Sequence, residues 1–406
     1  MDKVEKIEGG VVAAAGFKAA GVGAAIKYAG RNDVALIVAD APCSAAAVFT
    51  TNKVAAAPVV YDRIVAKGGV AQAILANSGC ANACTGEAGL KDAELSALAT
   101  AGELGISPEH VFVASTGVIG RRLPVERLLA GMKAAAAKLS RGDDAALDAA
   151  HAIMTTDTKP KQAAARVRIG GKRVTVGGMA KGSGMIEPNM ATMLAFITTD
   201  AAITPAMLKR AVKLAVAKSF NRIVVDGDES TNDSLFILAS GKAGNPVIDK
   251  AGEDFAAFEA ALEEVAVSLA RQMAADGEGA TKFVTVRVKG AKNAAQAERA
   301  ARAVAKSPLA KTSWFGRDPN WGRVLAAVGY SGADVVDMKA EVFYDGEWAF
   351  RRGEVADEAQ LARLAKVMEK PEFEITVDLH LGRGEAAIYT CDFSLDYVHI
   401  NADYTT

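Results

Sequence analysis

The chain has 406 residues, half of them hydrophobic, and its 47 basic and 48 acidic side chains leave a formal net charge of −1. This length predicts two or three structural units with a sizeable core, and the absence of a basic run argues against a nucleic-acid partner. Because only 3 Trp, 14 Phe and 7 Tyr occur, the core must be built mainly from Ala, Val, Leu and Ile.

The first part of the chain alternates short apolar runs, typical of buried strands, with amphipathic patterns, typical of helices. In chain order the sequence predicts strands 33–38 and 70–75, helices 91–104 and 125–139, a β-hairpin over 166–176, strand 192–198, helix 205–218, and strands 222–225 and 234–239. Pro124 precedes the second helix, and Gly170-Gly171 marks the turn of the hairpin.

The remaining pattern begins with one long helix and then resets after Gly279. It predicts helix 251–273, strand 282–288, helices 294–305 and 321–327, and strands 336–344, 373–381 and 385–389. Interleaved strands and helices indicate the α/β class, here a layered sandwich of sheets and helices with a smaller C-terminal α/β subdomain over about 281–395.

The composition gives no sign of export, membrane insertion or metal binding. Residues 1–6 are mixed in charge, unlike a signal peptide, and Lys18 and Lys27 interrupt the following apolar stretch too soon for a bilayer span. Four cysteines make no disulfide framework in a chain this long, and neither the scattered histidines nor Cys80 and Cys84 complete a metal site. We expect a cytoplasmic protein without metal or cofactor.

Three common nucleotide and hydrolase motifs are incomplete. The segment 20–23 lacks the third glycine of a dinucleotide-binding loop, and Gly241-Lys242 is followed by alanine, so no phosphate-binding P-loop forms. Position 181 is lysine, which excludes a nucleophile elbow around Ser183. Nucleotide hydrolases, common dehydrogenases and α/β-hydrolases are therefore disfavoured.

A strand that begins at Thr192 follows the small residue Ala191 in EPNMATMLAFITTDA, residues 187–201. A threonine hydroxyl needs a base, and an α-amine with a pKa of about 8 serves if threonine is N-terminal. Cleavage creates that amine: the Thr192 hydroxyl attacks the Ala191 carbonyl, and water hydrolyses the ester that results. From this stretch alone, an ordinary strand that opens with threonine remains the alternative.

Attack on a carbonyl also requires donors for the oxyanion. The segment 115–120, STGVIG, follows the strand-like residues 111–113 and offers the Thr116 hydroxyl and the Gly117 N–H. A simple turn after a strand is the other interpretation of this Ser/Thr/Gly cluster.

Several stretches together closely resemble the ornithine acetyltransferase (glutamate N-acetyltransferase) family, in order and over essentially the whole chain. They are AVFTTNKVAAAPV from Ala47, NSGCANACTG from Asn77, STGVIG from Ser115, MTTDTKPK from Met154, KGSGMI from Lys181, PNMATM from Pro188, VDGDESTND from Val225, SWFGRDPNWGRV from Ser313 and NADYTT from Asn401.

This resemblance implies acetyl transfer from N-acetylornithine to glutamate by ping-pong turnover through acetyl-Thr192. It implies self-cleavage into an α chain 1–191 and a β chain 192–406 that begins with the nucleophile, and an α2β2 assembly. Acetyl-CoA is a second acyl donor in some family members, and the sequence leaves this open. Thr116 and Gly117 take the oxyanion role, and the implied substrate contacts are Thr155, Lys181, Thr192, Glu278, Asn401 and Thr406.

Two positions depart from the pattern expected of the family, and two other functions remain open. Cys80 stands where we expect asparagine, and Glu229 where we expect a small residue such as threonine, whereas Cys84 is interpreted as a buried packing residue. The first alternative is an N-terminal-threonine amidohydrolase or aminopeptidase that passes its acyl group to water. The second is an uncleaved binding protein, against which the intact Thr192, Thr116 and Gly117 argue.

Overall fold

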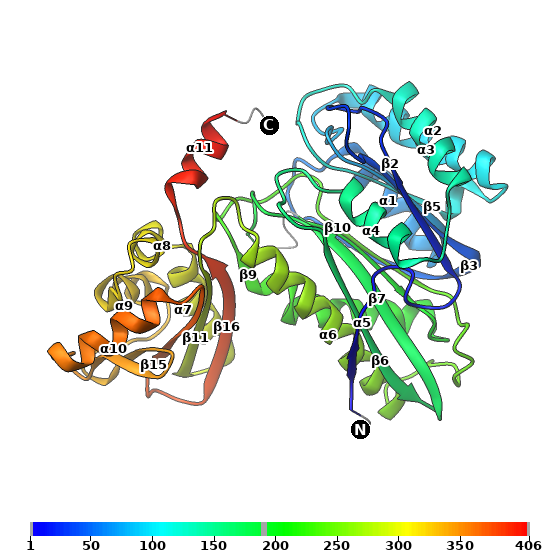
Figure 1. The fold of residues 1–406 in the computed structure, drawn as a ribbon. Coiled ribbons are helices and arrows are strands. Elements are labelled where there is room, and N and C mark those ends of the chain that lie inside the picture. The colour runs from blue at the N-terminus through cyan, green and yellow to red at the C-terminus, as the bar shows by residue number, and fades with distance from the viewer. Residues whose placement is uncertain (1–2, 188–192, 404–406) are drawn as a thin grey trace. The chain divides into compact units, whose positions relative to one another are not determined.

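The computed structural model describes residues 3–187 and 193–403, which divide into two compact units. Of the described residues, the first unit comprises 3–187, 193–221 and 228–273, and the second comprises 222–227 and 274–403. The second unit thus begins before residue 281 and also recruits a short segment from the middle of the chain. Figure 1 shows each unit as a sheet with helices packed on it, which confirms the α/β class.

Within the described residues, a nine-stranded sheet forms the centre of the first unit, with the strand order β1-β6-β7-β8-β10-β3-β4-β5 and with β2 paired to β3. The strands are β1 (Glu5–Ile7), β2 (Phe17–Val22), β3 (Val34–Phe49), β4 (Val70–Asn77), β5 (Val111–Ser115), β6 (Lys161–Ile169), β7 (Lys172–Lys181), β8 (Leu194–Thr199) and β10 (Ser234–Ala239). The helices are α1 (Ala57–Gly68), α2 (Gly86–Leu104), α3 (Val125–Ala137), α4 (Asp143–Ala152), α5 (Pro205–Lys218) and α6 (Glu253–Ala275), with 3-10 turns at Pro108–His110 and Phe220–Arg222.

Alternate residues of this sheet enter different cores, because successive side chains of a strand point to opposite faces. On β3, Val34 and Leu36 join a cluster with apolar residues of α2 and α3, whereas Ala35 and Ile37 join a cluster with the alanines of α4. The sheet is therefore covered on both faces, and its small side chains let the helices approach closely.

The second unit is built on a seven-stranded sheet of the order β14-β13-β12-β15-β11-β16-β9 in the part of the chain that the structure describes. Its strands are β9 (Ile223–Val224), β11 (Phe283–Ala291), β12 (Glu341–Tyr344), β13 (Glu347–Arg351), β14 (Glu354–Val355), β15 (Glu372–Asp378) and β16 (Gly384–Cys391). Its helices are α7 (Ala294–Lys306), α8 (Pro308–Phe315), α9 (Trp321–Tyr330), α10 (Glu358–Glu369) and α11 (Leu395–Asp403), with a 3-10 turn at Asp337–Lys339.

Most predicted elements are present, and the differences have local causes. The hairpin is longer than predicted, since its arms β6 and β7 pair from Lys161↔Ala180 to Ile169↔Lys172. The predicted strand 336–344 is wrong in its first half, where Val336 precedes a 3-10 turn. The sequence also did not predict the helices α1, α4, α8, α10 and α11. These helices have 8 to 12 residues each, and helices this short depend on tertiary packing rather than on local propensity. The predicted strand 192–198 corresponds to β8, which begins at Leu194. Of its first two predicted residues, Thr192 lies outside the described residues and Met193 precedes β8.

No helix in the described parts of the chain is long and apolar enough to cross a membrane.

The core of the first unit contains an aromatic cluster that allows a stability test. Phe236 on β10 is fully buried, and its ring centroid lies 5.9, 4.7 and 5.8 Å from those of Phe49, Phe112 and Phe196. Phe236→Ala leaves a cavity, so we expect the free energy of unfolding to fall by about 3–5 kcal/mol. Denaturant unfolding checks this against Ile64→Ala, whose side chain is 66% exposed. Equal losses in the two variants would contradict the assigned core.

Candidate active site

Thr116 and Gly117 follow the C-terminal end of β5 and pack against the loop after β4. The Thr116 N–H donates to the Asn77 carbonyl at 3.0 Å, and Cys80 forms isolated β-bridges with Thr116 and Val118. Gly117 has φ +129°, and a Cβ there would lie 2.5 Å from the Gly79 carbonyl carbon. A glycine is therefore required at position 117, because only a residue without a side chain fits this conformation and approach.

Lys181, at the end of β7, brings three of the predicted site residues together. Its buried ammonium donates to the Thr155 hydroxyl at 2.7 Å and to the Thr116 hydroxyl at 3.5 Å. Thr116, Thr155 and Lys181 thus form one polar cluster, although they are separated by up to 65 positions in the sequence.

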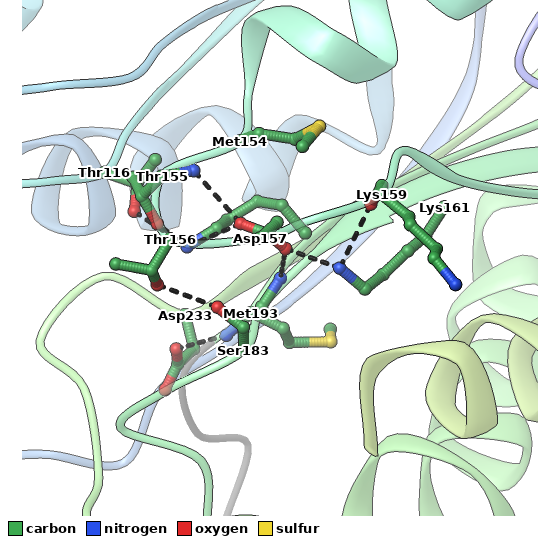
Figure 2. Close-up of polar contacts among 12 residues, drawn as sticks. Thr116, Met154, Thr155, Thr156, Asp157, Lys159, Lys161, Ser183, Met193 and Asp233 are labelled. Carbon is green, nitrogen blue, oxygen red and sulfur yellow. Dashed lines mark hydrogen bonds and ion pairs between the residues drawn. The ribbon is translucent and has the colours of Figure 1, made fainter. Parts of the chain in front are cut away.

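Asp157, which the sequence patterns did not single out, is hydrogen-bonded to this cluster, and Figure 2 shows its contacts. Its carboxylate accepts from the Lys161 ammonium at 2.7 Å and from the Gly182 and Thr155 N–H groups at 2.7 and 3.0 Å. Lys181 Nζ lies 3.8 Å from Asp157 Oδ2. The signal was present in MTTDTKPK, where an acid and a lysine lie four residues apart, but that spacing is common on solvated surfaces.

Electrostatics keep Asp157 ionised although it is completely buried. Burial alone raises a carboxyl pKa, but here the charges of Lys181 and Lys161, with the hydrogen bonds from Lys161 and Thr155, outweigh it and hold the pKa of Asp157 well below its usual range. The negative charge of Asp157 therefore stabilises two lysine side chains in the interior of the first unit.

The strand register places the beginning of β8 beside Lys181. Lys181 pairs with Leu194 in the antiparallel β7–β8 ladder, and Leu194 pairs with Ser234 in the parallel β8–β10 ladder. The Met193 N–H donates to Asp233 Oδ1 at 2.6 Å, a contact also drawn in Figure 2. The predicted cleavage residues Ala191 and Thr192 lie outside the described residues, two or three positions before Leu194.

Two of the other predicted contacts, Glu278 and Asn401, belong to the second unit. Asn401 on α11 donates from Nδ2 to Glu278 Oε2 at 2.8 Å and to the Tyr397 carbonyl at 2.9 Å. Glu278 is largely buried, just before Gly279, which adopts φ +66°. The structure thus pairs Glu278 with Asn401, and Thr406 lies outside the described residues.

The cysteines and Glu229 differ in environment. Cys80 is buried and its Sγ lies 3.5 Å from the Arg121 carbonyl oxygen, so burial raises the pKa of its thiol. The prediction that Cys84 is buried is wrong: Cys84 is exposed and adopts φ +57° in the turn before α2. Glu229 is exposed, and its backbone carbonyl accepts a hydrogen bond from Asn52 Nδ2 at 3.3 Å. In the described parts of the chain, no group of three or more His, Cys, Asp or Glu residues is placed to hold a metal ion.

These features define a layered α/β protein with a buried lysine–threonine site beside a glycine-dependent loop. A family model described as the ArgJ family matches residues 18–406. The chain is 54% identical to the arginine biosynthesis bifunctional protein ArgJ of Symbiobacterium thermophilum, over 99% of this chain and 100% of that protein. It is 53% identical to the protein of the same name from Geobacter sulfurreducens, over 96% and 99%.

A crystal structure of the arginine biosynthesis bifunctional protein ArgJ from Bacillus halodurans is similar, with a TM-score of 0.51 and 40% identity. The match covers 52% of this chain and 100% of that chain. These matches show that the chain belongs to the ArgJ family.

The buried carboxylate of Asp157 gives a pH-dependent prediction. Asp157→Asn leaves Lys161 and Lys181 without their shared anion, so we expect about 3–5 kcal/mol lower stability at pH 7. Since the folded-state pKa of Asp157 is lowered, its contribution is present above the ordinary aspartate pKa of about 4 and is lost as the pH falls towards the folded-state pKa.

Thermal unfolding of parent and variant across pH checks this: the gap in Tm should be widest near neutrality and narrow below about pH 4. The control is Asp40→Asn, which breaks a largely exposed ion pair with Arg141 and should cost at most about 1 kcal/mol. A gap that is constant with pH would show that Asp157 is not ionised in the folded protein.

Proposed function

We propose that this chain transfers the acetyl group of N2-acetyl-L-ornithine to L-glutamate, yielding L-ornithine and N-acetyl-L-glutamate. Relatives that match over nearly their whole length are called arginine biosynthesis bifunctional proteins, which supports a role in that pathway. The observation that carries the proposal is the cluster of Lys181, Thr155 and Thr116, which lies where β7 pairs with Leu194, two residues after Thr192.

In this proposal the chain first cleaves itself between Ala191 and Thr192. The Thr192 hydroxyl attacks the Ala191 carbonyl, and the acyl group moves from nitrogen to oxygen, which frees the Thr192 α-amine. Water then hydrolyses the ester, which restores the Thr192 hydroxyl and leaves Ala191 with a carboxylate. The fragments 1–191 and 192–406 each contain about half of the residues. A solved relative whose complete chain matches 52% of this one supports such a division.

Acetyl transfer then proceeds in two half-reactions. The Thr192 amine accepts the hydroxyl proton while the oxygen attacks the acetyl carbonyl, and the proton passes to the departing ornithine nitrogen. The Thr116 hydroxyl and the Gly117 N–H stabilise the oxyanion. The amine of glutamate attacks the acetyl-Thr192 ester in the same way, so no cofactor is needed.

The same residues serve both substrates because both are α-amino-acid derivatives of similar size. Lys181 pairs with the substrate carboxylate, and the Thr155 hydroxyl holds the Lys181 ammonium in place. Glu278, Asn401 and Thr406 are the further substrate contacts that we propose. The proposed state is a cytoplasmic α2β2 assembly of the two fragments, which the native mass of the purified protein tests.

The identity of the acetyl acceptor, glutamate or water, distinguishes this proposal from the hydrolase alternative. Ornithine release from N-acetylornithine should depend on glutamate, and N-acetylglutamate should form in equal amount. Release at the same rate without glutamate would favour an N-terminal-threonine amidohydrolase. Because the relatives are named bifunctional, acetyl-CoA is the second donor to assay with glutamate.

For the nucleophile, we expect Thr192→Ala to remain one uncleaved chain without transfer activity, since it lacks the attacking hydroxyl. Thr192→Ser keeps a hydroxyl and should still be cleaved. Denaturing electrophoresis and the transfer assay check both variants. A cleaved and active Thr192→Ala protein would overturn the mechanism.

For the oxyanion donor, we expect Thr116→Ala to lower kcat about a hundredfold with little change in KM, because one stabilising hydroxyl is lost. The control is Thr204→Ala, which removes a threonine hydroxyl that caps α5 by accepting from the Met207 N–H. Steady-state kinetics on both variants provide the check, and an unchanged kcat in Thr116→Ala would remove Thr116 from this role.

A further inference from the structure

Asn232 and Asp233 immediately precede β10 and contact both sides of the proposed reaction centre. Asp233 Oδ1 accepts from the N–H of Met193, the residue that follows Thr192 in sequence, at 2.6 Å. Asn232 Nδ2 donates to the carbonyl of Ser115, the residue that precedes Thr116, at 2.8 Å. Two adjacent side chains thus connect the neighbours of the proposed nucleophile and of the proposed oxyanion donor.

The orientation of the Asn232 amide is fixed by its surroundings. The carbonyl oxygens of Ser115 and Ala81 can only accept, so the amide atom that faces both is the donor Nδ2, and the Thr231 hydroxyl donates to Oδ1 at 2.6 Å. The second Nδ2 hydrogen bond goes to the Ala81 carbonyl at 2.6 Å. Ala81 in turn donates from its N–H to the Val118 carbonyl at 3.0 Å. Asn232 therefore secures both the oxyanion loop and the loop that packs against it.

Asp233 is equally constrained on the other side. It is 1% exposed, and its carbonyl accepts from the Thr50 N–H at 2.9 Å. Ser234, the next residue, pairs with Leu194 across the β8–β10 ladder. The start of β8 is therefore held by a side-chain contact as well as by the strand register, and it cannot shift without breaking both.

We propose that Asn232 and Asp233 are positioning residues, which set the separation between the nucleophile and the oxyanion donors. This inference rests on the proposed function. Neither side chain needs to touch the substrate: Asp233 acts through Met193, and Asn232 acts through Ser115 and Ala81. After the proposed cleavage, Asn232 also joins the two fragments, since it lies after residue 192 and both its carbonyl partners lie before it.

The structure supplies a matched control at Asn245. This asparagine is 5% exposed, against 7% for Asn232, and its side chain also bridges backbone groups. It accepts from the Ala202 N–H at 2.8 Å and donates to the carbonyls of Ala202 and Pro246 at 3.2 and 2.7 Å. Asn245 lies after the C-terminal end of β10, whereas Asn232 lies before its beginning.

The test compares Asn232→Ala with Asn245→Ala, at a temperature well below the Tm of either variant. We expect similar losses of Tm, because each variant loses buried hydrogen bonds. Asn232→Ala alone should lower kcat for acetyl transfer roughly 10- to 100-fold, with KM for N-acetylornithine nearly unchanged, because misplaced reacting groups slow the chemical step. It should also slow the appearance of the two fragments. A kcat and cleavage rate equal to those of the parent would overturn the inference, as would equal losses in Asn245→Ala.

A second variant covers the case in which Asn232→Ala does not fold. Asn232→Asp keeps the size of the side chain but replaces the donor NH2 with an acceptor that faces two carbonyl oxygens, so we expect the same loss of kcat. Cleavage and acetyl transfer by the parent protein show which of the two proposals has failed. A parent that is cleaved but transfers no acetyl refutes the proposed function, and the cleavage rates of the variants still test the positioning role. A parent that is not cleaved overturns both.

Discussion

The site depends on the register of β8, which is hydrogen-bonded to a strand on each side. Leu194 pairs with Lys181 of β7 and Ser234 of β10, so these ladders bring three distant segments together at one end of three central strands. A shift of one residue would turn every side chain of β8 to the opposite face, where it would enter the wrong core. Because β8 is fully buried, that register is strongly specified. The polar cluster therefore depends on hydrophobic packing further along the strands.

The charges at this end of the strands stabilise the arrangement that the strand register creates. A lysine inside a protein loses its hydration, and a buried lysine is stable only if an anion or several acceptors replace the water. Asp157 supplies that anion to Lys161 and Lys181 at once, and backbone N–H groups stabilise the carboxylate in turn. The Lys181 ammonium is thereby held beside the hydroxyls of Thr116 and Thr155, where we propose that the substrate carboxylate binds. It also explains why the acid belongs in the same motif as Thr155.

The sequence could predict the elements whose signals are local. The hairpin turn at Gly170-Gly171, the strand at 111–113 before Thr116, and the long helix of residues 251–273 are examples, and β5 and α6 confirm the last two. Motif resemblance could also point to Thr116, Thr155 and Lys181, which the structure brings together. It could not reveal Asp157, Asn232 or Asp233 as parts of the site, because their partners are set by sheet order and strand register. The prediction that Cys84 is buried was wrong for a related reason, because the packing of the loop before α2 decides whether its side chain is covered.

We propose that this chain becomes an enzyme by self-cleavage, and the most direct test is the denatured intact mass of the purified, untagged protein. We expect two species whose masses correspond to cleavage between Ala191 and Thr192, with Thr192 as the new N-terminal residue. A single species with the mass of all 406 residues would contradict it, and the uncleaved binding protein would become the better interpretation.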